Sequence, residues 1–385
     1  MWLTSPRNEN TPLAGLKVVE LARVLAGPWA GQILSDLGAD VIKVESPDGD
    51  GTRKWGPPWV EREGPDGKLR REAAYYHSAN RGKRSTIADF KDADDLARVK
   101  SLIADADVLI ENFKTGTLAK FGLDYESLRG DNPALVYCSV TGFGQTGPRA
   151  HEAGYDFVIQ AMSGFMSITG EPDGQPMKMG ISISDLTCGL YSVIGIQAAL
   201  AMRERTGRGQ HVDMSLLDCS TALLGSQSMH YFVTGQNPPR MGNEHAQVSA
   251  YGVFPTSDGQ VVLAPANDGL FRRLLTLLKR DDLLDEVRFA TNEARLANRD
   301  ELDAMIAAET AIWSTADLLA ACNAGGIPAG PINGIDAAFA DPQMLARGMQ
   351  IELDGISGTR SPFTFSEAEL ALERPSPLLG EDDRG

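Results

Sequence analysis

The sequence predicts an α/β fold built on a parallel, doubly wound sheet, because strand and helix patterns alternate along its first half. Leu16–Leu21 has the apolar pattern of a strand, Pro28–Leu37 that of a helix that starts with proline, and Asp40–Glu45 that of a second strand. These segments form one βαβ unit. The turn at residues 22–28 lacks the glycine fingerprint of dinucleotide-binding proteins, so this unit gives no indication of such a cofactor.

The same alternation continues to about residue 217 and predicts further strands of the same sheet, with helices between them. Strands are expected at Ser85–Phe90, Val108–Phe113, Leu135–Val140 and His211–Leu217, and helices at Asp94–Ala104, Gly116–Gly122, Asp124–Leu128 and Gly189–Met202. Residues 46–68 are rich in glycine, proline and charge, and we expect a loop there.

A smaller α+β domain is expected in the second half of the chain. A hairpin pattern covers Tyr251–Phe254 and Gln260–Ala264, and helix patterns cover Leu270–Leu284, Arg299–Ala308 and Ala316–Ala324. Helix and strand candidates return at Phe339–Arg347 and Met349–Leu353, after a linker at Ile327–Ile332. The predicted boundaries are therefore 1–225 for the first part of a large domain, 226–328 for a small domain, and 329–385 for the last segment.

Composition excludes several classes of protein. The 385 residues carry a net charge of −16, which argues against non-specific binding to nucleic acid or to a membrane surface. Residues 41–120 hold 15 Lys and Arg against 14 Asp and Glu, so an anionic ligand is expected to bind there. The four cysteines and five histidines show no metal-ligand spacing. No apolar run appears long enough to span a bilayer and no signal peptide is visible, so a cytoplasmic protein with reduced thiols is expected.

Asp185 stands at the most informative position in the chain. Ile181 and Ile183 alternate with serines, which is typical of a short strand, and the apolar segment from Gly189 predicts a long helix. The helix is expected to end at the turn Thr206–Gly209. Asp185 would then lie where a strand is followed by a helix, a common place for ligand sites in α/β sheets. An aspartate before a helix is more often only an N-cap.

Seven segments together resemble one family, the class III CoA-transferases, the group of formyl-CoA transferase and carnitine CoA-transferase. The matching segments are Leu16–Ser46, Asn80–Ser85, Glu111–Gly122, Ser139–Pro148, Ala153–Gly164, Gly180–Leu190 and Thr206–Asp218. Within that family, the dicarboxylate transferases such as succinyl-CoA:glutarate CoA-transferase are the most similar subgroup, on the residues Trp55–Pro58, Thr141–Pro148 and Ala153–Asp156.

The resemblance implies a role for ten residues. Asp185 matches the nucleophile of the family, and the residues that match its CoA site are Val24, Leu25, Lys83, Asn112, Phe113 and Lys120. Tyr155 matches a position at the acyl end of the site. Asn243 and His245 are expected to contact substrate from residues 241–245, which replace the flexible glycine tetrad of the family. Ser46 stands where other members carry a basic residue that contacts the coenzyme.

The implied reaction needs CoA as a substrate and neither a tightly bound cofactor nor a metal. An aspartate has an ordinary pKa of about 3.9, so it is expected to be ionised at pH 7 and to attack the donor thioester directly. A mixed anhydride and then an aspartyl-CoA thioester would form on Asp185 before the acceptor acid reverses the steps. Backbone N–H groups of the Gly142–Gly147 loop are candidates for stabilising the oxyanions.

The resemblance also implies a large Rossmann-like domain made from both chain ends and an interlocked homodimer. Two other functions remain open. An α-methylacyl-CoA racemase shares this fold, but its histidine matches Tyr155, a poor base near pH 7. A non-catalytic CoA-binding protein is the second alternative, and the intact Asp185 argues against it.

Overall fold

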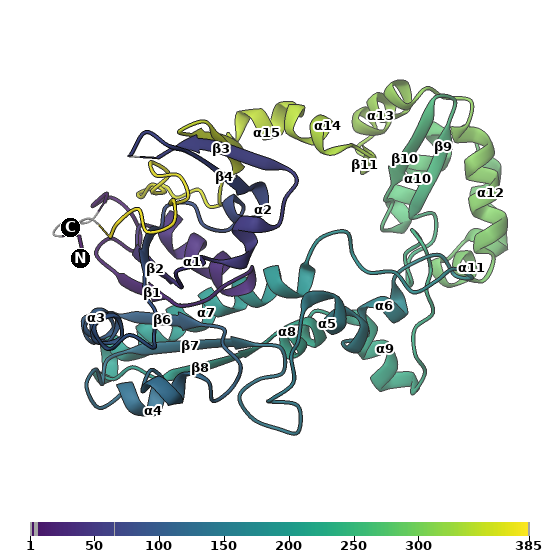
Figure 1. Ribbon diagram of the computed structural model, residues 1–385. Coiled ribbons are helices and arrows are strands. Elements are labelled where there is room, and N and C mark those ends of the chain that lie inside the picture. The colour runs from purple at the N-terminus through teal and green to yellow at the C-terminus, as the bar shows by residue number, and fades with distance from the viewer. Residues whose placement is uncertain (1, 4–6, 65, 384–385) are drawn as a thin grey trace. The chain divides into compact units, whose positions relative to one another are not determined.

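A computed structural model describes residues 2–3, 7–64 and 66–383 of the protein, which divide into two compact units (Figure 1). The first unit contains the chain through Met166, then Lys178–Gln236, and the segment from Pro342 onward. The second contains Ser167–Met177 and Asn237–Asp341. The second unit differs from the expected 226–328 in three ways. Residues 226–236 belong to the first unit, the second unit extends to Asp341, and it also includes the separate segment Ser167–Met177.

The centre of the first unit is a six-stranded sheet in the order β5-β2-β1-β6-β7-β8, and every neighbouring pair is parallel. Its strands are β1 (Lys17–Glu20), β2 (Asp40–Glu45), β5 (Arg84–Ile87), β6 (Val108–Glu111), β7 (Val136–Thr141) and β8 (His211–Ser215). This order is that of a doubly wound Rossmann sheet, whose chain reverses direction of growth between its first and fourth strands. The predicted parallel sheet is therefore confirmed, and the reversal lies between β1 and β6.

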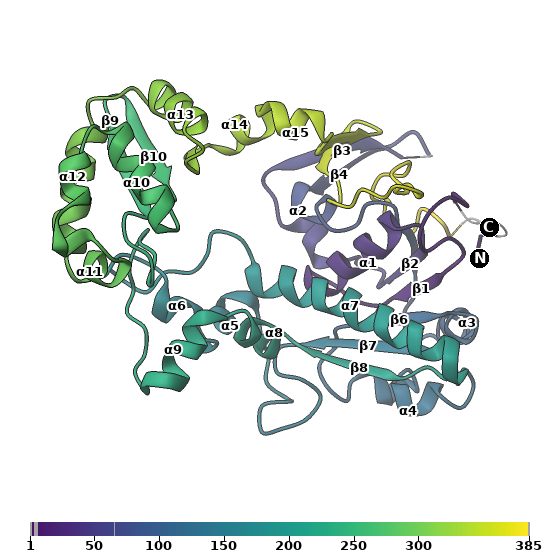
Figure 2. The same ribbon diagram turned by 180° about the vertical axis from the view of Figure 1, so that it is seen from behind.

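Helices cover both faces of this sheet, as buried strands with continuous apolar runs require. One core joins the sheet to α1 (Ala26–Asp36) and α7 (Ile183–Thr206), through side chains such as Ile33 and Ile196. The other joins it to α3 (Ala93–Ala104), η2 (Leu118–Phe121) and α4 (Tyr125–Leu128), through side chains such as Leu102. Figure 2 shows α7 lying along β7 and β8.

Helix α7 carries Asp185 and packs closely on α1. Any side chain at Gly189 would put a carbon 2.7 Å from the backbone oxygen of Ala26, so only glycine allows this approach. The helix ends at Gly207, which has φ 69° and closes the last turn as a left-handed C-cap. Contrary to expectation, α7 has the length and apolar composition of a membrane span. Its packing against α1 and the sheet gives it the place of a core helix.

Three sequence expectations about local structure were wrong. The strand expected at Ile181–Ile183 is not formed, because Ile183 already belongs to the first turn of α7. The expected loop at 46–68 contains β3 (Trp59–Glu63), which pairs with β4 (Leu69–Ala73). The expected linker at Ile327–Ile332 contains β11 (Ala329–Pro331), an edge strand of the second unit. Short, exposed strands carry too little apolar periodicity to be detected in a sequence.

The remaining elements of the first unit are short. They are η1 (Gly51–Lys54), α2 (Ala74–His77), α5 (Asp156–Met162), α8 (Leu216–Ala222), α9 (Ser226–Thr234), α15 (Pro342–Ala346), β12 (Gln350–Leu353) and β13 (Ile356–Thr359). Helix α6 (Phe165–Ile168) contains the boundary between the first unit and the second. The C-terminal residues return to the sheet and to α1. The N–H of Asp382 donates to the carbonyl of Ser85 on β5, and the N–H of Ala371 donates to the carbonyl of Asp36 on α1.

The second unit is a three-stranded antiparallel sheet with helices around one apolar core. The predicted hairpin is confirmed as β9 (Gly252–Thr256) and β10 (Gly259–Leu263). Its helices are α10 (Asp268–Leu277), η3 (Asp281–Leu284), η4 (Val287–Phe289), α11 (Asn292–Ala297), α12 (Arg299–Thr310), α13 (Thr315–Ala324) and α14 (Ile335–Ala340).

Candidate functional site

A cavity of about 410 Å³ lies at the carboxyl ends of β1 and β6, where the strand order reverses. Ligands of open α/β sheets bind at this position. Six of the ten predicted site residues line the cavity, and they are Val24, Leu25, Asn112, Phe113, Tyr155 and Asp185. The sheet topology therefore gathers residues from four separate parts of the sequence around one aspartate.

Reciprocal hydrogen bonds join the two strand ends that form the cavity wall. The side-chain oxygen of Asn112 accepts from the N–H of Arg23 at 2.9 Å, and its amide nitrogen donates to the carbonyl of Arg23 at 2.6 Å. The guanidinium of Arg23 lies 5.0 Å from the ring centre of Phe113. Asn112 thus fixes the distance between the β1–α1 turn and the segment after β6.

Val24 has a backbone conformation that is rare for its side chain. Its φ is 72°, in the left-handed region that a β-branched residue strongly disfavours. The carboxylate of Asp50 accepts from the N–H of Val24 at 3.2 Å, and the same carboxylate forms an ion pair with Lys43 at 3.0 Å. Such strain persists where surrounding structure holds it, and it is concentrated at functional sites.

Asp185 lies in the first turn of α7, and a second carboxylate holds that turn in place. The carboxylate of Asp156 accepts from the N–H of Ser184 at 2.9 Å and from the side-chain amide of Gln160 at 2.7 Å. Gln160 is fully buried, and its side-chain oxygen accepts from the N–H of Met179 at 2.9 Å. Helix α5 therefore anchors both the approach to α7 and its first residues, and with them the position of Asp185.

The surroundings of Asp185 correct the expectation that it is fully ionised at pH 7. Burial, and then the negative charge of Asp156, raise the pKa of Asp185 to about 7. A carboxylate with a raised pKa is less solvated and more basic, so each ionised molecule is the better nucleophile. The consequence is that only about half of the molecules carry the reactive form at neutral pH.

We therefore expect the rate of transfer to depend on pH through Asp185. The carboxylate is the reactive form, so kcat should rise through pH 7, where it is about half of its maximum, and level off about one pH unit higher. In the Asp156→Asn variant the repulsion is absent, the pKa of Asp185 falls, and the rise should move to lower pH. Initial rates between pH 5 and 9 measure both profiles. Superimposable profiles would remove Asp156 from this role.

Tyr75, an aromatic residue near Asp185, escaped the sequence analysis, which used its neighbour Trp55 only as a mark of the subgroup. The ring of Tyr75 meets that of Trp55, a cavity residue, edge to face at 5.3 Å. Burial, and then the charge of Asp185, raise the pKa of Tyr75. Tyr75 follows the unexpected β3–β4 hairpin, so no sequence pattern placed it near α7.

Lys83 is not at the cavity surface, although the resemblance placed it in the coenzyme site. Its side chain is fully buried, and its ammonium group contacts Glu20 at 2.8 Å. The same nitrogen donates to the carbonyls of Pro28 and Ala79 and to the side-chain oxygen of Asn80, each at 2.8 Å. An ammonium has three protons, so these acceptors use its full hydrogen-bonding capacity. In this structure Lys83 supports the β1–α1 region from within.

The other predicted residues lie in different settings. Lys120 is exposed in η2 and does not line the cavity in the described chain. Tyr155 precedes α5 and is 64% exposed. Asn243 and His245 belong to the second unit, where Arg299 donates to the carbonyl of His245 at 2.7 Å. Their contact with substrate stays a prediction.

The glycine-rich loop after β7 is held by the protein itself. The N–H of Gly144 donates to the hydroxyl of Thr141, and that of Gln145 donates to the carboxylate of Asp213 at 2.9 Å. Those two N–H groups are therefore already used. Gly142 lines the cavity and touches Gly154 so closely that a side chain would lie 2.6 Å from its Cα. Among the described residues, no cluster of His, Cys, Asp and Glu could hold a metal ion.

Comparison with known proteins agrees with this arrangement. A family model described as CoA-transferase family III matches residues 13–383. The succinate–glutarate CoA-transferase of Agrobacterium fabrum is 55% identical over 98% of this chain and 96% of its own length. The succinyl-CoA:mesaconate CoA-transferase of Haloarcula marismortui is 40% identical over 96% of this chain and 92% of its own. The crystal structure of a CaiB/BaiF family protein from Brucella suis has a TM-score of 0.88 and 55% identity, over 97% of each chain. The chain therefore belongs to CoA-transferase family III, and it is a class III CoA-transferase.

Proposed function

We propose that this enzyme moves CoA from an acyl-CoA, succinyl-CoA or a similar thioester, to a short dicarboxylate. The observation that carries the proposal is the partly buried Asp185 in a cavity at the reversal point of the sheet. Support for the substrate class comes from the similar proteins, whose names give succinate, glutarate and mesaconate. All three are dicarboxylic acids of four or five carbons.

In the proposed mechanism Asp185 carries each half of the exchange in turn. Its carboxylate attacks the thioester carbonyl and expels CoA thiolate, which leaves an acyl–aspartyl anhydride. The thiolate then attacks the aspartyl carbonyl, releases the donor acid and forms an aspartyl-CoA thioester. The acceptor carboxylate attacks that thioester and expels CoA thiolate, which leaves an acceptor–aspartyl anhydride. The thiolate then attacks the acceptor carbonyl, forms the product thioester and releases the carboxylate of Asp185. One thioester is consumed and one is formed, so no other reactant is needed.

Two cationic side chains of the cavity wall could pair with an anionic ligand. They are Arg23 and Lys114, and they line the cavity together with the acidic residues Glu152 and Asp185. CoA and dicarboxylates are both anions, and such cations would attract them. We place the pantetheine arm of CoA along Val24, Leu25, Asn112 and Phe113, with the acyl end toward Asp185 and Tyr155.

A cytoplasmic homodimer is part of the proposal. The first unit exposes large apolar side chains on three of its helices, and they are Phe157, Val158 and Met162 on α5, Leu190 and Ile194 on α7, and Met229, Phe232 and Val233 on α9. So large an apolar surface is unusual for a monomer, and a second copy of the chain would cover it. Light scattering should give twice the mass of the chain, and the mass of one chain would refute the dimer.

An exchange assay separates the proposed transferase from a racemase. The enzyme is mixed with succinyl-CoA and glutarate in deuterated water, and with a 2-methylacyl-CoA in a parallel sample. We expect glutaryl-CoA to form and no deuterium to enter the α-carbon, because Tyr155 stands where the racemases carry their histidine base. Rapid deuterium uptake without transfer to any free acid would instead identify a racemase.

A further inference from the structure

Side chains hold the backbone of the turn that connects β1 to α1, at the wall of the Asp185 cavity. Between the carbonyl of Ala22 and the N–H of Val24 the turn has four consecutive polar backbone groups, and a side chain is hydrogen-bonded to each of them. Val24 and the next residue, Leu25, line the cavity. The shape of this part of the wall therefore depends on the side chains that make the four bonds.

Asn112 and Lys43 hold the first half of the turn. Asn112 is bonded to the N–H and to the carbonyl of Arg23, at 2.9 and 2.6 Å. Lys43, on β2, donates to the carbonyl of Ala22 at 2.7 Å. Its side chain is fully buried, and the register of β1 and β2 places it beside Glu20, whose carboxylate it contacts at 3.0 Å. Two neighbouring segments of the sheet thus fix the backbone before Val24.

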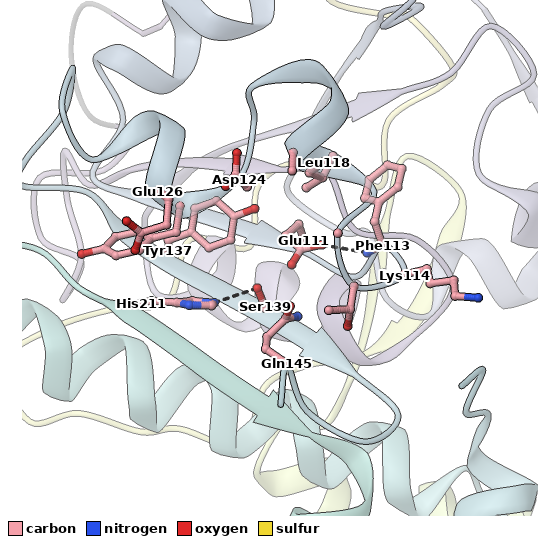
Figure 3. A pocket seen from close by; sticks show the side chains of 14 residues that line it. Glu111, Phe113, Lys114, Leu118, Asp124, Glu126, Tyr137, Ser139, Gln145 and His211 are labelled. Atoms are coloured by element: carbon pink, nitrogen blue, oxygen red, sulfur yellow. Dashed lines mark hydrogen bonds between the residues drawn. The ribbon is translucent and has the colours of Figure 1, made fainter. Parts of the chain in front are cut away.

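The segment that carries Asn112 is itself held in place. Figure 3 shows the carboxylate of Glu111, the last residue of β6, accepting from the N–H of Phe113 at 2.8 Å. This bond lies in the wall of a neighbouring cavity of about 220 Å³, which shares Phe113 and Lys114 with the Asp185 cavity. Because the bond spans Asn112, that side chain extends toward the turn from a backbone of fixed shape.

Asp50 holds the last of the four groups, the N–H of Val24, at 3.2 Å. The residue is 1% exposed, and both oxygens of its carboxylate face donors. One oxygen accepts from the N–H and the hydroxyl of Thr52 at 3.0 and 2.8 Å, and the other contacts Lys43 at 3.0 Å as well as Val24. An amide here would turn its NH₂ group toward one pair of donors, so only an ionised carboxylate suits all four.

The backbone of Asp50 is anchored independently of the turn. Its N–H donates to the carboxylate of Glu45, at the end of β2, at 2.9 Å. The guanidinium of Arg53 donates to both oxygens of that carboxylate, at 2.9 and 2.6 Å, and Glu45 and Arg53 are both buried. The carboxylate that faces Val24 therefore has a position set by β2 and η1.

The conformation of Val24 is the one that needs this support. At φ 72° its Cβ crowds the following carbonyl oxygen, and a residue other than glycine is destabilised there. Without its bonds the residue would relax to negative φ, and the wall formed by Val24 and Leu25 would change shape. The bond to Asp50, together with those on Ala22 and Arg23, keeps the strained form.

We propose that Asp50, with its partner Lys43, is a positioning residue for the coenzyme, because it keeps Val24 in the left-handed conformation that shapes the cavity wall. This inference rests on the proposed function, which places the pantetheine arm of CoA along Val24 and Leu25. When only a fraction of the molecules has the correct wall, the Kd for CoA rises by the inverse of that fraction. Asp50 acts in this way although it does not line the cavity in the described chain.

The test is a cycle of variants at positions 24 and 50 of the full-length enzyme. Glycine adopts positive φ without strain, so Val24→Gly should remove most of the need for Asp50. We expect Asp50→Ala to raise the Kd for free CoA, from calorimetry, about tenfold in the wild-type background and less than about threefold in the Val24→Gly background. Asp50→Asn keeps the volume of the side chain and should act in the same direction, so it serves if the alanine variant does not fold. An equal factor in the two backgrounds would overturn the inference.

A matched control removes a different buried aspartate of the same unit. Asp36 is fully buried, forms an ion pair with Arg81 and does not line the cavity in the part of the chain that the structure describes. Asp36→Ala should bind CoA with the Kd of the wild type. A rise as large as that in Asp50→Ala would mean that loss of any buried ion pair weakens binding, and the positioning role would be refuted.

A second readout does not need CoA. Hydrogen–deuterium exchange with mass spectrometry should show faster exchange of residues 22–27 in Asp50→Ala than in the wild type, and unchanged exchange of β7 in the same sheet. Equal exchange of residues 22–27 in the two proteins would contradict the inference. Faster exchange there, combined with a wild type that does not bind CoA, would instead count against the proposed function.

Discussion

Replacing Asp185 by alanine should lower kcat for CoA transfer by about 10⁴-fold or more, because the variant has no group that can hold the acyl fragment and CoA in turn. Without the nucleophile that forms both intermediates, the variant can accelerate transfer only by binding the two substrates close together. The affinity for free CoA should change little, since the proposed mechanism places Asp185 at the reacting carbonyl and away from the coenzyme nucleotide. Transfer rates and calorimetry on the same preparation measure both.

The matched control is Asp131→Ala, which removes an exposed carboxylate from the turn after α4. Asp131 does not line the Asp185 cavity in the described chain. That variant should keep the rate of the wild type. If Asp185→Ala kept more than about a tenth of the activity, the covalent mechanism would be wrong, because no substitute nucleophile reaches such a rate.

Replacing Lys83 by methionine should lower the free energy of unfolding by about 3–5 kcal/mol, the cost of breaking a buried ion pair by removing one partner. The substitution leaves three oxygens, on Pro28, Ala79 and Asn80, without their shared donor. It also leaves the buried Glu20 with Lys43 as its remaining ammonium partner, at 3.0 Å. Denaturant unfolding of the wild type and of the variant measures the change.

The two lysines around Glu20 respond differently to burial. Burial lowers the pKa of Lys83 to about 8, in spite of the attraction of Glu20. Burial opposes the charge of Lys43 as well, but Glu20, Asp50 and Glu45 together raise its pKa. In the folded state Lys83 therefore releases its proton more easily than in the unfolded chain, so its own contribution to stability should grow between pH 8 and 10.5.

Lys120→Met is the control for Lys83→Met. Lys120 is exposed, so its loss should change stability by no more than about 0.5 kcal/mol. If Lys83→Met instead left stability unchanged and raised the KM for acyl-CoA, Lys83 would contact the coenzyme, as the family resemblance implied.

The sequence pattern predicts individual strands and helices of this protein, whereas their order in the sheet follows only from the fold. Buried strands and long helices carry strong periodic signals, so β2 was located at both of its ends and α7 ends in the predicted turn Thr206–Gly209. The order of the strands was not predicted, since it depends on which apolar faces meet. That order decides the site, because it brings the segment after β6 next to the segment after β1.

Site residues could be predicted where they belong to a sequence motif of the family. They could not be predicted where the role of the residue depends on how deeply it is buried. Asp185 and Asn112 were identified by resemblance and lie in the cavity. Lys83 lies in a segment that resembles the family, but only the structure reveals that its side chain is fully buried. Tyr75 lies in no motif, and its approach to α7 follows from the β3–β4 hairpin. The raised pKa of Asp185 could not be read from residue type either, because burial and Asp156 cause it.

Mass spectrometry of the enzyme trapped during turnover tests the central claim most directly. The wild type is mixed with succinyl-CoA, quenched with hydroxylamine and digested, and the peptide that contains Asp185 is sequenced. The account predicts a hydroxamate on Asp185, formed from its anhydride or thioester, and none on Asp156 or in a sample without acyl-CoA. An unmodified Asp185 in an enzyme that transfers CoA at full rate would contradict the account.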